Sequence, residues 1–137
     1  MTQHTGGCLC GLVRYRTDGA PLWVVHCHCN SCRRHTGSAI ATFVGFKREQ
    51  VEFLSRHRST YASSPGVLRG FCAQCGTPIS YEADACPGEL HLYVGTFDDP
   101  ENFTPQSHVF HAEHLPWLET DDALPRFPGS GSPGAAP

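Results

Sequence analysis

The sequence of 137 residues has little of several features that mark common protein classes. It contains one Met and one Lys, and no run approaches the roughly 18–20 apolar residues that a membrane-spanning helix needs. The first residues lack the basic and then apolar layout of a secretory signal peptide. A phosphate-binding glycine loop and a nucleophile elbow are also missing. We therefore expect a globular, cytoplasmic protein with no membrane partner.

Acidic residues are scarce in the first part of the chain and basic residues in the second, although the formal net charge of the whole chain is only −3. Residues 1–81 hold nine basic and three acidic residues, a net charge of +6, and residues 82–137 hold one basic and ten acidic residues, a net charge of −9. Such asymmetry is found in nucleic-acid-binding proteins. The basic residues are scattered pairs rather than a stripe, and nine of the ten are Arg. A small anionic substrate, or pairing between the two halves, fits this pattern better than a nucleic acid.

The hydrophobic pattern predicts short strands and almost no helix. Runs of four to eight residues rich in β-branched and aromatic side chains are separated by turn signals containing Gly, Pro, Asp and Ser. The predicted strands cover residues 12–16, 22–25, 40–46, 51–54, 67–71, 79–81 and 90–94. Because strands and helices do not alternate, we expect an antiparallel, mainly β fold.

One short helix is predicted over residues 31–36, with Asn30 as its N-cap and Gly37 just after its last turn. A length of 137 residues suits one domain, which we place over residues 1–127. Residues 128–137, rich in Gly, Ser and Pro, are predicted to form a disordered tail.

Cysteine is the residue that the chain has in excess. Seven of the eight cysteines fall into three close-spaced groups: Cys8 and Cys10; Cys27, Cys29 and Cys32; and Cys72 and Cys75. Close-spaced pairs deliver two thiolates from one turn, as tetrahedral zinc requires. A disulfide framework needs an oxidising compartment, for which the sequence has no signal. Buried free thiols would explain the isolated Cys86 but not three groups.

The cysteine count indicates two different metal sites. Two pairs close one tetrahedron, as in a structural site, and the triplet leaves one position open, as in a catalytic site. Spacing alone also permits other partitions, such as the triplet completed by a nearby His. In an extended segment Cys27 and Cys29 face one side, while His26 and His28 face the other. A zinc ion with three thiolates is a weak Lewis acid but holds a substrate thiol as thiolate, which suggests sulfur chemistry.

These motifs resemble the glutathione-dependent formaldehyde-activating enzyme family, which includes the centromere protein V domain. The resemblance rests on the sequence segments GCLCG at residues 7–11, CHCNSCRR at 27–34, FCAQCGT at 71–77, VGTFDDP at 94–100 and LPW at 115–117. It implies a β-tent of two antiparallel sheets with one short helix, built around two zinc ions. Residues 1–127 would form the zinc-binding domain.

The resemblance also implies roles for individual residues. Cys8, Cys10, Cys72 and Cys75 would hold a structural zinc ion, and Cys27, Cys29 and Cys32 a catalytic one. The implied activity is that of a carbon–sulfur lyase, which forms or cleaves S-hydroxymethylglutathione or a related glutathione–aldehyde adduct. The nearest candidates for contacts with the glutathione carboxylates are Arg33, Arg34, His35 and Ser38. The alternative is a non-catalytic zinc module that binds protein or nucleic acid.

Three further histidines, His108, His111 and His114, recur at every third residue. Neighbours three apart in a strand face opposite sides, and Pro116 argues against a helix, so we expect loop or pocket-rim positions rather than a metal site. Trp23 and Trp117 are expected in the core.

Overall fold

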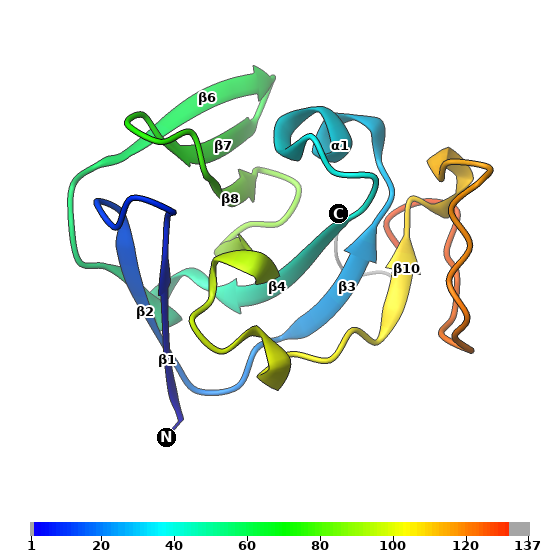
Figure 1. Ribbon diagram of the computed structural model, residues 1–137, viewed down its shortest axis with the longest axis horizontal. Coiled ribbons are helices and arrows are strands. Elements are labelled where there is room, and N and C mark those ends of the chain that lie inside the picture. Colours follow the sequence, from blue (N-terminus) through cyan, green and yellow to red (C-terminus); the bar gives the residue numbers. More distant parts are fainter. Residues whose placement is uncertain (1, 132–137) are drawn as a thin grey trace.

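The computed structural model describes residues 2–131 and shows two sheets that meet like the sides of a tent (Figure 1). A three-stranded sheet has the order β1-β2-β5, and a seven-stranded sheet has the order β10-β3-β4-β9-β8-β7-β6. The strands are β1 (Gln3–Gly7), β2 (Arg14–Asp18), β3 (Trp23–Cys27), β4 (Ala41–Lys47), β5 (Val51–Phe53), β6 (Arg58–Ser64), β7 (Val67–Cys72), β8 (Pro78–Ala83), β9 (Glu89–Tyr93) and β10 (Ser107–Val109). The mainly β fold with two sheets is confirmed.

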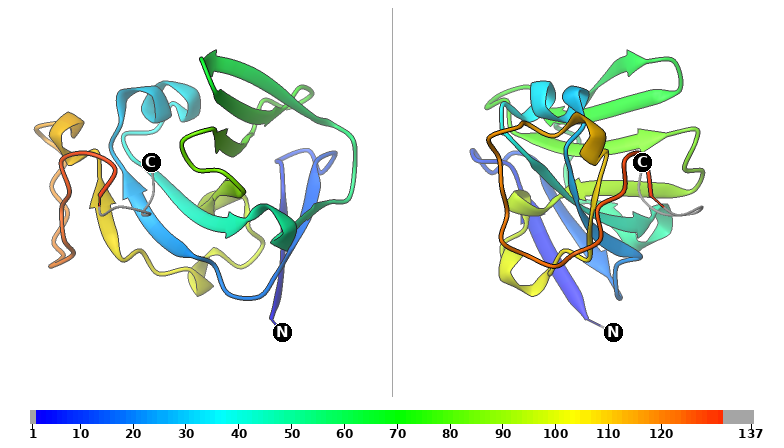
Figure 2. Two further views of the ribbon diagram at one scale, coloured as in Figure 1. Left: turned by 180° about the vertical axis from the view of Figure 1, so that it is seen from behind. Right: turned by 90° about the vertical axis from the view of Figure 1, so that its right-hand side faces the viewer.

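The strand pairs are antiparallel with one exception, because β10 runs parallel to β3. This corrects the expectation of purely antiparallel sheets. After β10 the chain turns back, and a backbone hydrogen bond from Phe127 to His108 ties the C-terminal segment to the outer side of β10 (Figure 1). The β6–β7 hairpin projects at the opposite end of the molecule (Figure 2).

The helix α1 (Asn30–Thr36) follows the β3 strand and is the one α-helix in residues 2–131. Short 3-10 helices cover Arg48–Gln50, Val94–Thr96, Pro100–Asn102 and His111–Glu113. None of the helices in this range is long and apolar enough to cross a membrane. Gly37 ends α1 in the left-handed conformation, with φ 72°, as predicted. The N-cap is Cys29 rather than the predicted Asn30, because the Cys29 thiol accepts the N–H of Cys32.

Two buried clusters form the core. The larger lies between the two sheets and includes the fully buried Tyr15, Phe46 and Leu92. The smaller lies on the other face of the seven-stranded sheet, around Phe43 and Val109, and contains Cys27 and Cys32. Alternation along β9 explains this division, because Leu90 and Leu92 face the larger cluster and Tyr93 the smaller. Trp117 is 70% exposed, so its predicted place in the core is wrong.

Ion pairs join the basic half of the chain to the acidic half. Arg14, at the start of β2, pairs with Asp98, and both Arg48 and Arg58 pair with Glu82. These ion pairs neutralise part of the charge asymmetry within the molecule, as the scattered arginines suggested.

The predicted tail begins in an ordered position. The carbonyl oxygens of Pro128 and Gly129 accept hydrogen bonds from the N–H groups of Ala112 and Phe110. Residues 132–137 lie outside the described residues, so the disorder predicted for 128–137 stays a prediction there.

Candidate functional site

Four cysteines from two distant turns lie together between the sheets. Cys8 and Cys10 come from the β1–β2 connection, and Cys72 and Cys75 from the end of β7 and the β7–β8 connection. Their sulfur atoms all lie within 4.8 Å of one another, and we call this group the four-cysteine cluster. Each pair is held by a tight turn in which the residue after the second cysteine, Gly11 or Gly76, has a positive φ and donates its N–H to the carbonyl of the first.

The sulfur spacing of this cluster fits a tetrahedral metal ion. The Sγ atoms of Cys8 and Cys10 are 3.6 Å apart, and those of Cys10 and Cys72 are 3.8 Å apart. Zinc–sulfur bonds of ~2.3 Å at tetrahedral angles give sulfur–sulfur distances of about 3.8 Å. All eight cysteines are free thiols in the structure, so a disulfide framework is not formed. A metal bound here would join the three-stranded sheet to the seven-stranded one.

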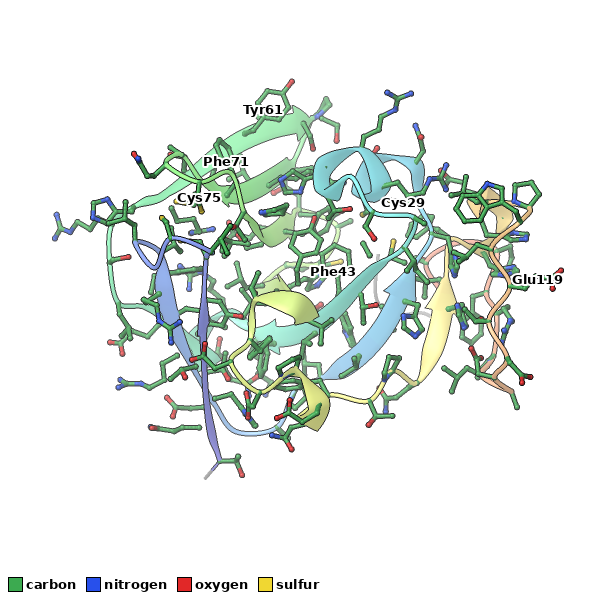
Figure 3. The ribbon with its side chains drawn as sticks, in the orientation of Figure 1. Cys29, Phe43, Tyr61, Phe71, Cys75 and Glu119 are labelled. Atoms are coloured by element: carbon green, nitrogen blue, oxygen red, sulfur yellow. The ribbon has the colours of Figure 1, made fainter. Side chains whose placement is uncertain are left out.

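The second group comprises Cys27, Cys29 and Cys32, and we call it the three-cysteine cluster. Cys27 ends β3, Cys29 caps α1, and Cys32 lies in the first turn of α1, so one strand-to-helix junction supplies all three thiols. Their sulfur atoms also lie within 4.8 Å of one another, with 3.8 Å between Cys27 and Cys32. Figure 3 shows Cys29 at the foot of α1 and Cys75 at the other side of the molecule, near the β1–β2 turn. The chain thus brings the cysteines together as four and three.

Negative charge in the three-cysteine cluster concentrates on Cys29. Hydrogen bonds from the thiols of Cys27 and Cys32 lower the pKa of the Cys29 thiol well below its usual range, and the N–H of Cys32 and the charge of Arg69 act in the same direction. Hydrogen bonds to Cys29 and to Cys32, together with burial, raise the pKa of the Cys27 thiol. A thiolate is therefore stabilised here even before a metal displaces the other protons.

Arg69 is the cation nearest to this cluster, although sequence reasoning did not single it out. It comes from β7, is only 6% exposed, and its Nη1 donates to the Cys32 sulfur at 3.5 Å. Its Nε donates to the Ser63 hydroxyl at 3.1 Å, and its guanidinium carbon lies 5.0 Å from the centre of the Tyr81 ring. These contacts hold a buried positive charge in one orientation beside the three thiols.

A small cavity of about 50 Å³ opens on the three-cysteine cluster. Its lining consists of the three cysteines together with Arg69 and three aromatic rings, those of Phe43, Tyr81 and Phe110. Phe110 is the one residue other than glycine with a positive φ in residues 2–131, at 53°. Left-handed backbone is strained for such a residue and is found preferentially at functional sites. The cavity thus combines soft ligands, one buried cation and apolar walls.

The four residues predicted to bind substrate lie around α1, outside the lining of this cavity. Arg33 donates to the backbone carbonyls of His28 and Glu113, so its guanidinium holds the helix to the His111–Glu113 turn. His35 lies 2.8 Å from the Tyr93 hydroxyl, and the Ser38 hydroxyl donates to the Ile40 carbonyl. Arg34 is exposed to solvent. Their role in substrate binding stays a prediction.

Three histidines, the half-buried His26 and the buried His28 and His108, pack together behind the three-cysteine cluster. His26 and His28 face away from the thiols, as predicted, and pack against His108. Because the Asp122 carboxylate only accepts, His108 donates from Nε2, and its Nδ1 accepts the Nε2–H of His28 at 2.8 Å. The expected rim position is wrong for His108, which is fully buried in β10, whereas His111 and His114 line a surface pocket.

Comparison with known proteins adds to this geometry. A family model described as "Glutathione-dependent formaldehyde-activating enzyme" (GFA) matches residues 3–113. The chain belongs to the GFA family. An uncharacterized lyase of Schizosaccharomyces pombe is 27% identical over 106 residues, which cover 76% of this chain and 75% of that protein. The crystal structure of a Rhodobacter sphaeroides protein matches with a TM-score of 0.57 at 19% identity, covering 89% of this GFA chain and 98% of the other, and so shares its fold.

Local sequence signals for the cavity walls were weak. Arg69 and Tyr81 stand in ordinary alternating strands, β7 and β8, and only the pairing of Arg69 with Tyr81 across those strands brings both to the cluster. The available signal was an Arg inside an otherwise apolar predicted strand, residues 67–71, where a buried charge needs a partner.

Proposed function

We propose that this GFA protein is a zinc-dependent carbon–sulfur lyase that forms or cleaves adducts between the thiol of glutathione and a small aldehyde, S-hydroxymethylglutathione being the simplest. The observation that carries the proposal is the opening of the three-cysteine cluster into a cavity that contains a buried guanidinium. The description of the family and the name of the yeast relative support the reaction class.

The donor set of the three-cysteine cluster fits zinc, since its three thiols are soft ligands within 4.8 Å of one another. Zinc bound by Cys27, Cys29 and Cys32 would supply a Lewis acid that keeps a substrate thiol deprotonated. No other His, Cys, Asp or Glu of the described residues completes this set. The four-cysteine cluster, with its full set of thiols, suits a structural ion.

The walls of the cavity determine what the chain itself contributes. In the synthetic direction the thiol sulfur forms a bond to the aldehyde carbon, the carbonyl π bond breaks, and the thiol proton ends on the oxygen; the lyase direction reverses each change. Arg69 is placed to donate a hydrogen bond to the oxygen as it gains negative charge. Phe43, Tyr81 and Phe110 exclude water from the reacting atoms.

The cavity is large enough for only the reacting part of the substrate. A volume of about 50 Å³ accommodates the sulfur and the one-carbon group but not a tripeptide. The remainder of glutathione must therefore extend over the surface, where Arg34, His35 and Ser38 of the α1 region are the proposed contacts. A bulky aldehyde is expected to be a poor substrate for the same reason.

The test measures adduct formation from glutathione and formaldehyde by NMR with the zinc-loaded full chain. We expect Cys29→Ala to abolish the rate enhancement while circular dichroism shows a folded domain. Arg69→Gln should lower kcat/KM by about 100-fold, the usual cost of one oxyanion donor. Arg56→Gln is the matched control, because Arg56 is exposed and does not line the cavity, and the activity of this variant should be unchanged. Wild-type zinc-loaded protein that binds zinc but accelerates neither direction would overturn the proposal and favour a non-catalytic zinc module.

A further inference from the structure

The eighth cysteine, Cys86, lies in a third group of metal-ligand side chains outside both clusters. It stands in the turn that connects β8 to β9, and Glu89 and His91 follow it on β9. One ligand atom of each residue lies within 4.8 Å of the others. We propose that Cys86, Glu89 and His91 form a third, separate zinc site, with one coordination position left for water or another ligand.

The local backbone explains how these three side chains converge. Glu89 and His91 are two residues apart on a strand and therefore point to the same face of the sheet. The turn closes over that face, since the Cys86 N–H donates to the Ala83 carbonyl and the Glu89 N–H donates to the Cys86 carbonyl. The site is thus formed by one continuous segment of chain and needs no rearrangement of the sheets.

The donor atoms are chemically suited to zinc. Thiolate, imidazole and carboxylate are its three usual protein ligands, with bonds of ~2.0–2.3 Å. His91 Nε2 and Glu89 Oε1 are already 2.9 Å apart, so an ion that replaces the shared proton needs only a small opening of this pair. His91 is 1% exposed and its ring is fixed between Trp23 and Tyr81.

The surroundings favour a cation and give it a path. A groove of about 770 Å³ reaches Cys86 and Glu89 from solvent. The charged residues along it are Arg48, Glu82, Asp84 and Glu89. Glu82 is paired with Arg48 and with Arg58, and the other two carboxylates leave the groove negative. A hydrated divalent ion is therefore attracted into the groove and meets the thiol and the carboxylate first. One thiolate among three donors also makes this the weakest of the three sites, so a chelator should empty it first.

Zinc content measured by elemental analysis tests the proposal on the full chain after zinc loading and desalting. We expect wild type to hold one more zinc ion per chain than Cys86→Ala and than Glu89→Gln. Asp84→Asn is the matched control, because Asp84 is an exposed acid in the same groove that belongs to none of the three groups, and it should hold as much zinc as wild type. The readout is a difference between variants, so it stands whether or not the three-cysteine cluster proves catalytic. Equal zinc content in wild type and both variants would overturn the site.

A second measurement on unaltered protein applies even where a variant fails to fold. Iodoacetamide labelling followed by mass spectrometry gives the alkylation rate of Cys86 with and without zinc. Ligation by zinc should slow labelling of Cys86 at least tenfold, and a short treatment with a chelator should restore it before the two clusters lose their metal. A Cys86 labelling rate that zinc leaves unchanged contradicts the proposal.

Discussion

Replacing Cys10 by Ser distinguishes a metal-bearing four-cysteine cluster from four thiols that merely pack together. Cys10 is exposed, so the substitution creates no cavity and removes no core contact. An exposed substitution of this kind ordinarily changes the free energy of unfolding by less than about 0.5 kcal/mol. If the cluster holds zinc, the same change removes one of four ligands from an ion that joins the two sheets.

The expected loss follows from the energy of structural zinc. Such ions contribute about 10–16 kcal/mol of apparent binding energy, against a total stability of about 5–15 kcal/mol for a whole domain. Loss of even a quarter of the zinc term costs about 3 kcal/mol, which lowers Tm by roughly 10 °C or more in a domain of this size.

Thermal unfolding followed by circular dichroism, with zinc present and after chelation, provides the assay. Leu9→Ala is the control, because Leu9 lies between the two cysteines and is 89% exposed, and it should change Tm by no more than 1–2 °C or so. Chelation should lower the Tm of wild type toward that of Cys10→Ser. A Cys10→Ser protein whose Tm equals that of Leu9→Ala and does not change when chelator is added would refute the structural role of the cluster.

Three further predictions concern packing and charge. His108→Ala should lower the free energy of unfolding by roughly 3 kcal/mol in urea titrations, because it leaves the buried His28 imidazole without its acceptor and empties the space of a fully buried ring; a loss under 1 kcal/mol would contradict the histidine chain. Gly45→Ala places a methyl group 2.3 Å from the Trp23 ring, so we expect a loss of about 1–3 kcal/mol and a changed tryptophan fluorescence. Hydrogen bonds from Arg14 and then Thr5 lower the pKa of Asp98, so the stability that they provide is present above about pH 4 and is lost as the pH falls further. Arg14→Gln should therefore flatten the decline of Tm between pH 5 and 3, and an unchanged profile would show that the pair contributes nothing measurable.

Strands with alternating or continuous apolar side chains were predictable, because that hydrophobic pattern by itself indicates a buried face. Seven predicted strands correspond to β2, β3, β4, β5, β7, β8 and β9, with ends displaced by one or two residues. The missed strands carry no such signal. The β6 strand is polar and mostly exposed at the edge of the sheet, β1 consists of Gln, His, Thr and two Gly residues and so has no apolar side chain, and β10 has only three residues. Their strand conformation comes from pairing with neighbours, which is a long-range property.

The candidate site divides in the same way. Cys27, Cys29 and Cys32 are held together by one junction of strand and helix, so their spacing predicted the cluster. Local spacing could not predict the wall of the cavity. Arg69 and Cys32 are 37 positions apart in the sequence, and the order of strands in the sheet brings them into contact. The identity of the helix cap was also missed, because propensity favours Asn over a cysteine whose sulfur carries charge.

The sequence by itself determined which side chains could act together as metal ligands, because ligands two to five residues apart converge whatever the rest of the chain does. It determined seven clustered thiols and a mainly β scaffold. Only the tertiary structure decided which pairs share a site, that Arg69 and three aromatic rings enclose the open cluster, and that Cys86 meets Glu89 and His91. Those contacts depend on strand order and on which face each side chain takes, and both are fixed by burial of the two cores rather than by any local pattern.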